Sequence, residues 1–322
     1  MSALGQASAW IRFWHAPLRA ERLGAMRILL ALAILADQLV QNLPHFADFY
    51  GPEGVGYAGL HDEYQLSNWS WTILVFGSDD LTIVYLLFFV WMTCTVVWLI
   101  GWKTRIANVL VWFLTIAFIN RNPNIKNFGD SLLSVSLFLM MLSPSGRALS
   151  VDAWLRRRKL ARLVQAEAVL QPATTPAWPV RLIQIQLCMI YLSTGLAKLS
   201  ANPLFGHEWG TWWKGTSIWY VMNDCTRVRR AFAEYPAPFW ITLVATYASV
   251  WFETLFPLLV LCRWTRRWTL WVGVLFHIGI WLTIEVGWFS FYTLCMYAVW
   301  IPDSFWSTWD PPREAYAPKA QG

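Results

Sequence analysis

Two polar side chains and a lysine recur at a spacing of seven residues within one apolar segment. Gln184, Tyr191 and Lys198 all lie in the run from 182 to 199. Seven residues are nearly two turns of an α-helix, so the three side chains share one face. A lysine at the end of such a run must be neutral, ion-paired or in contact with water. Lys198 is therefore a candidate for chemistry; the alternative is an anchor that snorkels to lipid headgroups.

Three further ionisable side chains lie in other apolar runs. Asp37 is in the first run, Glu253 in the sixth and His277 in the seventh. Burying such groups in a bilayer is costly, so each is a functional candidate. Each also has a packing interpretation, in which a buried partner or a hydrogen bond fixes the helices. The number of ionisable groups favours function, with Glu253 and His277 joining Lys198 as catalytic candidates.

A second polar cluster joins two apolar runs at residues 121–130, with the sequence Arg-Asn-Pro-Asn-Ile-Lys-Asn-Phe-Gly-Asp. Its Asn, Pro and Gly residues suit a tight turn. Asp130 is placed to cap the helix that follows. A plain turn explains this composition, and the alternative is that Arg121 and Lys126 hold an anionic group.

The composition indicates a membrane protein. Hydrophobic residues make up 57% of the 322 and charged residues only 14%, against about 25% charged in soluble domains. The 24 Trp residues are typical of aromatic belts at membrane interfaces, although some could stack on a flat ring such as a quinone. The net charge of +6 resides in short connections between apolar runs, which is an orientation signal rather than a nucleic-acid surface. The five cysteines have no metal-site spacing.

The elements that must position these residues are membrane helices, each of about 20 apolar residues. We predict an all-α, polytopic transmembrane bundle of eight spans, with seven and nine as alternatives. The spans are 26–43, 81–101, 106–120, 130–143, 182–199, 239–262, 268–284 and 286–302. Residues 66–77 are too short to cross and predict an interfacial or re-entrant helix.

The charges in the loops predict that both termini lie inside. Lys and Arg gather in the inner loops, including the run 156–159, whereas residues 44–80 contain acids and no Lys or Arg. The basic run is interpreted as a topology anchor, with a lipid-headgroup or partner site as the alternative. We expect one membrane domain over residues 1–303 and a short disordered tail over 304–322.

Three sequence blocks together resemble the HTTM family, the membrane domain shared with vitamin K-dependent gamma-carboxylase. The first is Tyr-Leu-Ser-Thr-Gly-Leu-Ala-Lys-Leu at 191–199, followed by residues 213–217. The second is Phe-His at 276–277 with Val-Gly-Trp-Phe-Ser-Phe at 286–291. The third is the 121–130 turn, followed by Ser-Pro-Ser-Gly at 143–146 and Ser-Val-Asp at 150–152. The resemblance covers residues 20–303.

The resemblance implies roles for individual residues. The catalytic lysine of the carboxylases, which deprotonates reduced vitamin K, falls on Lys198. Burial in an apolar bundle favours the neutral amine that such a base needs. His277 would then orient or polarise the ring oxygen, and Glu253 would tune the site. The residues expected to bind the quinone are Gln184, Tyr191, Arg121, Lys126, Asp130 and Gly287.

The implied activity is quinol-dependent and carboxylase- or epoxidase-like, with O2 and CO2 as co-substrates. The chain ends soon after its last span, and the 121–130 turn lacks the histidine of the carboxylases, so quinol binding or oxidation is expected before peptide carboxylation. The alternative is a non-catalytic membrane protein that binds lipid or assists maturation or export of a secreted peptide. A transporter ranks last, since no inverted repeat is visible. We expect a multi-pass protein of the plasma or inner membrane.

Overall fold

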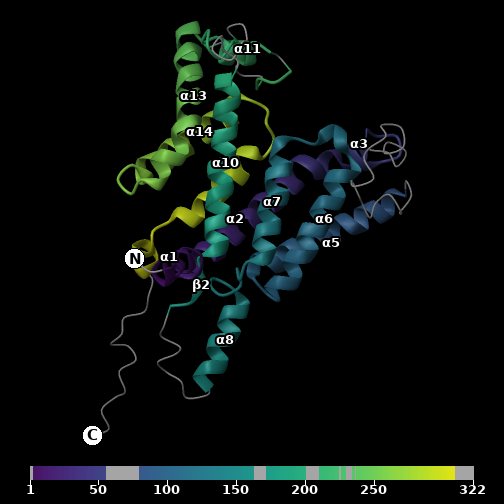
Figure 1. Cartoon of the computed structure of the whole chain (residues 1–322). Helices are drawn as coiled ribbons and strands as arrows, with labels where there is room; N and C mark the ends of the chain where they lie inside the picture. The colour runs from purple at the N-terminus through teal and green to yellow at the C-terminus, as the bar shows by residue number, and fades with distance from the viewer. Residues whose placement is uncertain are drawn as a thin grey trace. The chain divides into compact units, whose positions relative to one another are not determined.

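The computed structural model describes residues 3–55, 80–162, 172–200, 210–224, 226–229, 234–235 and 237–308. Within them the fold is helical, as predicted, apart from one short two-stranded sheet. The chain forms two compact units (Figure 1). Unit 1 comprises residues 1–183 and 297–322, and unit 2 comprises residues 184–296. The boundary at 183–184 falls inside helix α10 (Trp178–Ser200).

Unit 1 is built on four apolar helices that pack in chain order. α2 packs against α5, α5 against α6, and α6 against α7, the last three lying side by side in Figure 1. The elements are α1 (Ala3–His15), β1 (Pro17–Arg19), α2 (Glu21–Asp37), the π-helix η1 (Gln38–Asn42), η2 (Leu43–His45), α3 (Phe46–Tyr50), α5 (Leu81–Ile100), α6 (Thr104–Arg121), η4 (Pro123–Ile125), α7 (Phe128–Leu142), α8 (Val151–Arg162), β2 (Thr174–Pro176), η6 (Tyr297–Trp300) and α16 (Asp303–Ser307). β1 and β2 are antiparallel.

Local sequence explains where these helices begin and end. The carboxylate of Asp80 accepts a hydrogen bond from the Thr82 amide at 2.8 Å and caps α5. α5 ends at Gly101, whose φ of 72° is costly for residues with a side chain. The core between the helices is aromatic, with the rings of Trp91 and Phe118 stacked at 5.0 Å.

A buried guanidinium organises the loop between α7 and α8. Arg27 of α2 is fully buried and donates to the carbonyl oxygens of Ser145, at 2.7 Å, and Leu149. Leu149 has a φ of 51°, which this contact helps to hold. The conformation of this loop therefore depends on its hydrogen bonds to Arg27 of α2 and not only on the loop's own sequence.

Unit 2 contains the rest of α10, together with α11 (Ser217–Met222), α13 (Phe239–Leu261), α14 (Arg266–Thr283) and α15 (Phe289–Met296). α13 packs against α11 and α14, and α14 packs against α15. An isolated antiparallel bridge joins Val228 to Ile284, just beyond the end of α14. The three predicted catalytic residues lie on the long helices of this unit, Lys198 on α10, Glu253 on α13 and His277 on α14.

All eight predicted spans fall on helices, but the helices differ in length and apolarity. Among the described residues, four stretches are long and apolar enough to cross a membrane: Glu21–Tyr50, Leu81–Ile100, Trp178–Ser200 and Phe239–Leu261. The helices under the other four predicted spans are shorter or less apolar. The count of eight and the inside position of both termini therefore stay predictions.

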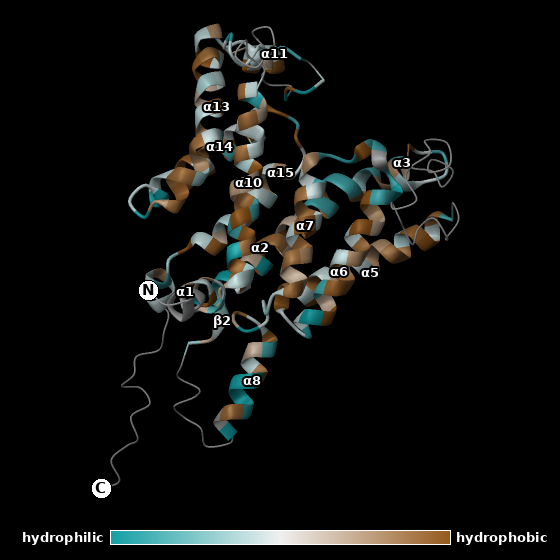
Figure 2. Cartoon of the chain, viewed as in Figure 1, coloured by the Kyte–Doolittle hydropathy of each residue, from teal (hydrophilic) through white to brown (hydrophobic). Residues whose placement is uncertain are grey.

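The outer faces of these helices are apolar. Only 33% of the most apolar window of α5 is buried, and much of its ribbon has the brown colour of hydrophobic residues in Figure 2. Apolar surface of this extent is unfavourable in water and suits contact with lipid.

Two sequence predictions concern the chain's less regular parts. The predicted interfacial helix at 66–77 lies outside the described residues. The predicted tail begins inside α16, where Trp306 is buried and Arg22 forms a 2.8 Å ion pair with Asp303. These contacts order residues 303–307, and the division into a domain over 1–303 and a disordered tail stays a prediction.

Candidate functional site

The polar stripe of α10 lies on a buried face. Tyr191 and Gln184 are almost fully buried, and the side chain of Lys198 is 17% exposed. The spacing of seven places the three on one side of the helix. In unit 2 this side of α10 meets side chains of α13 and α14.

Lys198 forms an ion pair with Glu253 of α13. Its ammonium group also donates to Ser249 Oγ at 3.3 Å. Ser249 and Glu253 are four residues apart, so they lie on the same face of α13. The side chain of Glu253 is only 9% exposed. The predicted base and the predicted tuning carboxylate therefore touch, and the pair is largely shielded from solvent.

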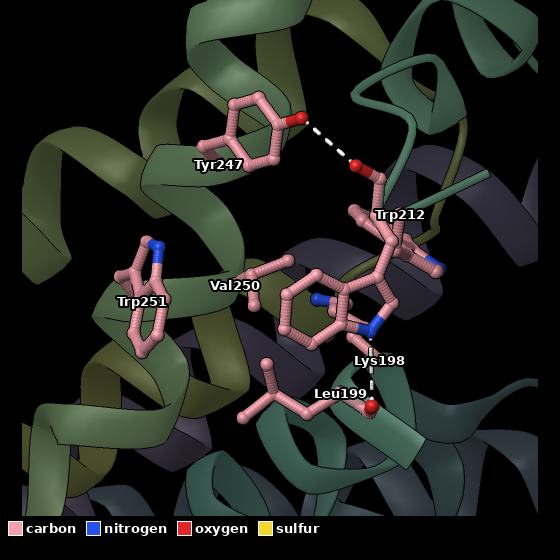
Figure 3. Close-up of a pocket in the computed structure, with 7 residues that line it drawn as sticks. Lys198, Leu199, Trp212, Tyr247, Val250 and Trp251 are labelled. Carbon is pink, nitrogen blue, oxygen red and sulfur yellow. Dashed lines mark hydrogen bonds between the residues drawn. The ribbon is translucent and has the colours of Figure 1, made fainter. Parts of the chain in front are cut away.

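An aromatic wall stands over the lysine. The ring centroid of Trp212 lies 4.7 Å from Lys198 Nζ, a cation–π distance. Trp213 Nε1 donates to the Leu199 carbonyl at 3.0 Å, and Tyr247 Oη donates to the Trp213 carbonyl at 2.8 Å (Figure 3). These two hydrogen bonds tie the turn at 211–215 to α10 and α13.

A cavity of about 90 Å³ opens between these groups (Figure 3). Its walls are mostly apolar and aromatic, and Lys198 supplies its cation. The lining residues are Lys198, Leu199, Trp212, Trp213, Tyr247, Val250 and Trp251. Indole and phenol rings at such a wall suit stacking on a flat ring. The described residues hold no group of His, Cys, Asp and Glu that could bind a metal ion.

A glycine lets α10 approach α13 at this level. A Cβ added at Gly195 would lie 2.5 Å from Thr254 Oγ1 and 2.6 Å from the Thr254 amide nitrogen. Any larger residue would push the two helices apart. Gly195 lies one helical turn before Lys198, so this close approach brings Lys198 of α10 within ion-pair distance of Glu253 of α13.

A second buried pair joins α10 to α14. Tyr191 Oη and His277 Nε2 lie 2.6 Å apart within a hydrogen bond. Phe256 stacks on the Tyr191 ring at 3.9 Å, and Phe289 packs against the imidazole. Among the described residues, His277 Nδ1 has no hydrogen-bond partner. The pair is thus a polar contact enclosed by aromatic rings.

The other predicted binding residues are divided between the two units. Gln184 is buried near the start of unit 2's part of α10. Gly287 lies in the connection between α14 and α15 with a φ of 59°, which favours glycine. Arg121, Lys126 and Asp130 belong to unit 1.

The turn that holds these three unit 1 residues is well bonded. Arg121 is buried, and its Nη2 donates to the Tyr50 carbonyl at 3.4 Å. The N-cap of α7 is Asn127 rather than the predicted Asp130, which is the third residue of the helix and accepts from the Asn127 amide at 2.7 Å in a capping box. Lys126 is exposed. The anion-binding role of Arg121 and Lys126 stays a prediction.

Sequence reasoning missed four contributors to the site. Ser249 was detectable, because it precedes Glu253 by one helical turn. Trp212 and Tyr247 carried no signal in a chain with 24 Trp and 11 Tyr. Pro257 lies inside α13, and proline lacks the amide hydrogen that would bond to the carbonyl four residues earlier, at Glu253.

A model of the HTTM domain matches residues 15–306. No curated protein and no solved structure matches the chain. The apolar helices and this match indicate a protein embedded in a lipid bilayer. With the match covering nearly its whole length, the chain belongs to the HTTM family, and its membrane helices are related to the membrane domain of the gamma-carboxylases.

Proposed function

We propose that this protein is a multi-pass enzyme of the plasma or inner membrane that binds a reduced quinone in unit 2 and uses Lys198 as the base. The observation that carries the proposal is the Lys198–Glu253 pair at a cavity walled by Trp212 and Trp213. A quinol offers a flat ring to such walls and a hydroxyl proton to the amine.

The ion pair supplies the acceptor that a basic lysine requires. When the shared proton rests on Glu253, Lys198 is a neutral amine and can take the proton of a quinol hydroxyl. The products of that step are an ammonium ion and a quinolate. Ser249, which accepts from Lys198 at 3.3 Å, keeps the amine aimed while the proton moves.

The overall reaction balances with oxygen as the oxidant. One quinol and one O2 give one quinone epoxide and one water. If the basic intermediate removes a proton from a peptide carbon, that carbon takes up CO2. The role predicted for His277, orienting the ring oxygen, is not part of this proposal, because its partner Tyr191 lies two helical turns from Lys198 and neither residue lines the cavity.

The test uses the full chain in nanodiscs with a reduced vitamin K-type quinone, O2 and bicarbonate. Wild type should bind the quinol and form epoxide, whereas both Lys198→Ala and Lys198→Arg should lose roughly 10²- to 10⁴-fold of the rate. Arg cannot act as a base near neutral pH. The matched control is Lys214→Ala, which removes an exposed lysine from the adjoining turn.

Two outcomes would overturn the proposal. Absence of quinol binding and epoxide in wild type would favour the non-catalytic alternative, a membrane protein that binds lipid or assists maturation or export of a secreted peptide. Retention of activity in Lys198→Arg would identify Lys198 as an anchor that needs only its charge.

A further inference from the structure

Helix α8 carries a dense positive charge that unit 1 leaves uncovered. Its basic residues Arg156, Arg157, Arg158, Lys159 and Arg162 are all exposed. Asp152 is the one acid in the helix, and its carboxylate is already bonded to Lys103 and Thr104, between α5 and α6. The charge is therefore not neutralised within the helix.

The start of α8 is fastened to the end of a candidate membrane span. The Asp152 amide donates to the Gly101 carbonyl, directly after α5, at 3.0 Å. The Asp152 carboxylate accepts from the amides of Lys103 at 2.9 Å and Thr104 at 2.8 Å. Because α5 is long and apolar enough to cross the bilayer, its end marks the level of the headgroups. α8 begins at that level and extends for about 18 Å at 1.5 Å per residue.

The side chains of α8 suit a headgroup environment. Trp154 is 53% exposed, and the Arg158 guanidinium lies 4.4 Å from its ring centroid. In the turn at the end of α5, Lys103 makes a similar contact with the exposed ring of Trp102, at 5.4 Å. Tryptophan favours the interfacial region, and basic side chains extend from it to phosphate groups.

A helix this short and this polar needs an external partner to stay folded. Isolated helices under about 12–15 residues are marginal in water, and residues 154–159 are exposed on every side of α8. In Figure 1, α8 extends away from the ends of α6 and α7. Packing against the other helices of unit 1 therefore does not stabilise α8.

We propose that α8 is a recognition helix for anionic lipid headgroups on the face of the bilayer where α5 ends. Charge complementarity selects the ligand: clustered Lys and Arg beside a span attract anionic phospholipid, and the attraction falls off within a Debye length. The attachment through Asp152 holds the nearest cations, Arg156 to Lys159, about 6–10 Å along the helix from that level, which is comparable to the Debye length. This surface belongs to unit 1 and is independent of quinol chemistry at Lys198.

The test compares amide hydrogen exchange of α8 in the full-length protein in two kinds of nanodisc. One contains phosphatidylcholine alone, and the other contains phosphatidylcholine mixed with phosphatidylglycerol. Exchange over α8 should be at least about tenfold slower in the anionic discs, because several cations act together. In 1 M salt, where the Debye length is about 3 Å, most of this difference should vanish.

Two variants separate charge from helix formation. R156Q/R157Q/R158Q/K159Q removes the charge while keeping good helix formers, so its exchange should be equally fast in both discs. R156K/R157K/R158K keeps the charge and should retain the protection. Equal exchange of the wild-type helix in both discs would overturn the proposal and assign the cations to topology or to a protein partner.

Discussion

The hydroxyl of Tyr191 and Nε2 of His277 are joined by a 2.6 Å hydrogen bond, seven residues along α10 from Lys198. That separation is about 10 Å along the helix axis. The site is therefore layered. The ion pair lies at the cavity, and the phenol–imidazole pair lies deeper in the aromatic packing of unit 2.

Removing the phenol hydroxyl should destabilise the protein. Tyr191→Phe keeps the ring on Phe256 but leaves His277 with two buried nitrogens and no partner among the described residues. We expect a loss of about 1–3 kcal/mol in the free energy of unfolding, measured by reversible unfolding in mixed micelles. Tyr220→Phe, at a 56% exposed position of α11, should be neutral. Equal effects of the two substitutions would argue against the buried pair.

Removing one charge of the ion pair should cost more than removing both. Glu253→Gln leaves the Lys198 ammonium without its counter-ion in a shielded place. We expect a loss of about 3 kcal/mol, the lower end of the range for buried pairs, because Lys198 keeps 17% of its side chain exposed. The double variant Lys198→Met, Glu253→Met should be close to wild type in stability, since apolar replacement of a buried pair is often neutral.

The same variants also separate stability from activity. The double variant should fold and yet form no epoxide from quinol. A double variant as unstable as Glu253→Gln alone would show that the loss comes from packing and not from an unpaired charge.

The approach of α10 to α13 should tolerate no side chain at its closest point. Gly195→Ala places a methyl group 2.5 Å from Thr254 Oγ1, so the helices must separate. Overpacking of this kind costs about 1–3 kcal/mol, visible as a lower apparent melting temperature. The matched control is Gly279→Ala in α14, where an added Cβ meets nothing within 4 Å. It should be neutral or stabilising, because alanine is the better helix former.

The contact at the start of α8 should weaken in acid. Partial burial raises the pKa of Asp152, but hydrogen bonds from Thr104 and Lys103, with the charge of Arg156, outweigh it, so the net pKa lies below its ordinary value of 3.8. A carboxylate with a lowered folded-state pKa adds stability above its unfolded pKa and loses it as the pH falls further. The difference in melting temperature between wild type and Asp152→Ala should have its largest value near neutral pH and should decrease below about pH 4. A difference that is constant with pH would contradict this assignment.

The helices could be predicted from the sequence because apolar runs and turn residues mark them directly. The 121–130 turn shows this with one difference, since Asp130 takes part in the capping box of α7 but Asn127 is its N-cap. Membrane crossing is harder to predict from apolarity alone. α14 carries His277, and Arg266 and Arg267 open it, which lowers its mean hydropathy although it packs against α13 as a bundle helix does.

Only those parts of the site that depend on spacing within one helix could be predicted from the sequence. The stripe Gln184, Tyr191 and Lys198 follows from a period of seven on α10. The pairing of Lys198 with Glu253, and of Tyr191 with His277, depends on how α10, α13 and α14 pack. No local pattern encodes that packing. Trp212 was hidden for a different reason, because tryptophan serves so many interfaces in this chain that its type carries no information.

The ion pair between α10 and α13 also gives a way to read other members of the family. Neither Lys198 nor Glu253 can change alone without leaving a shielded charge unpaired. In a relative, the two aligned positions should therefore vary together, and a neutral residue at one should accompany a neutral residue at the other. A member that keeps both has retained the proposed acid–base couple, and one that has lost both has kept the helical scaffold without it.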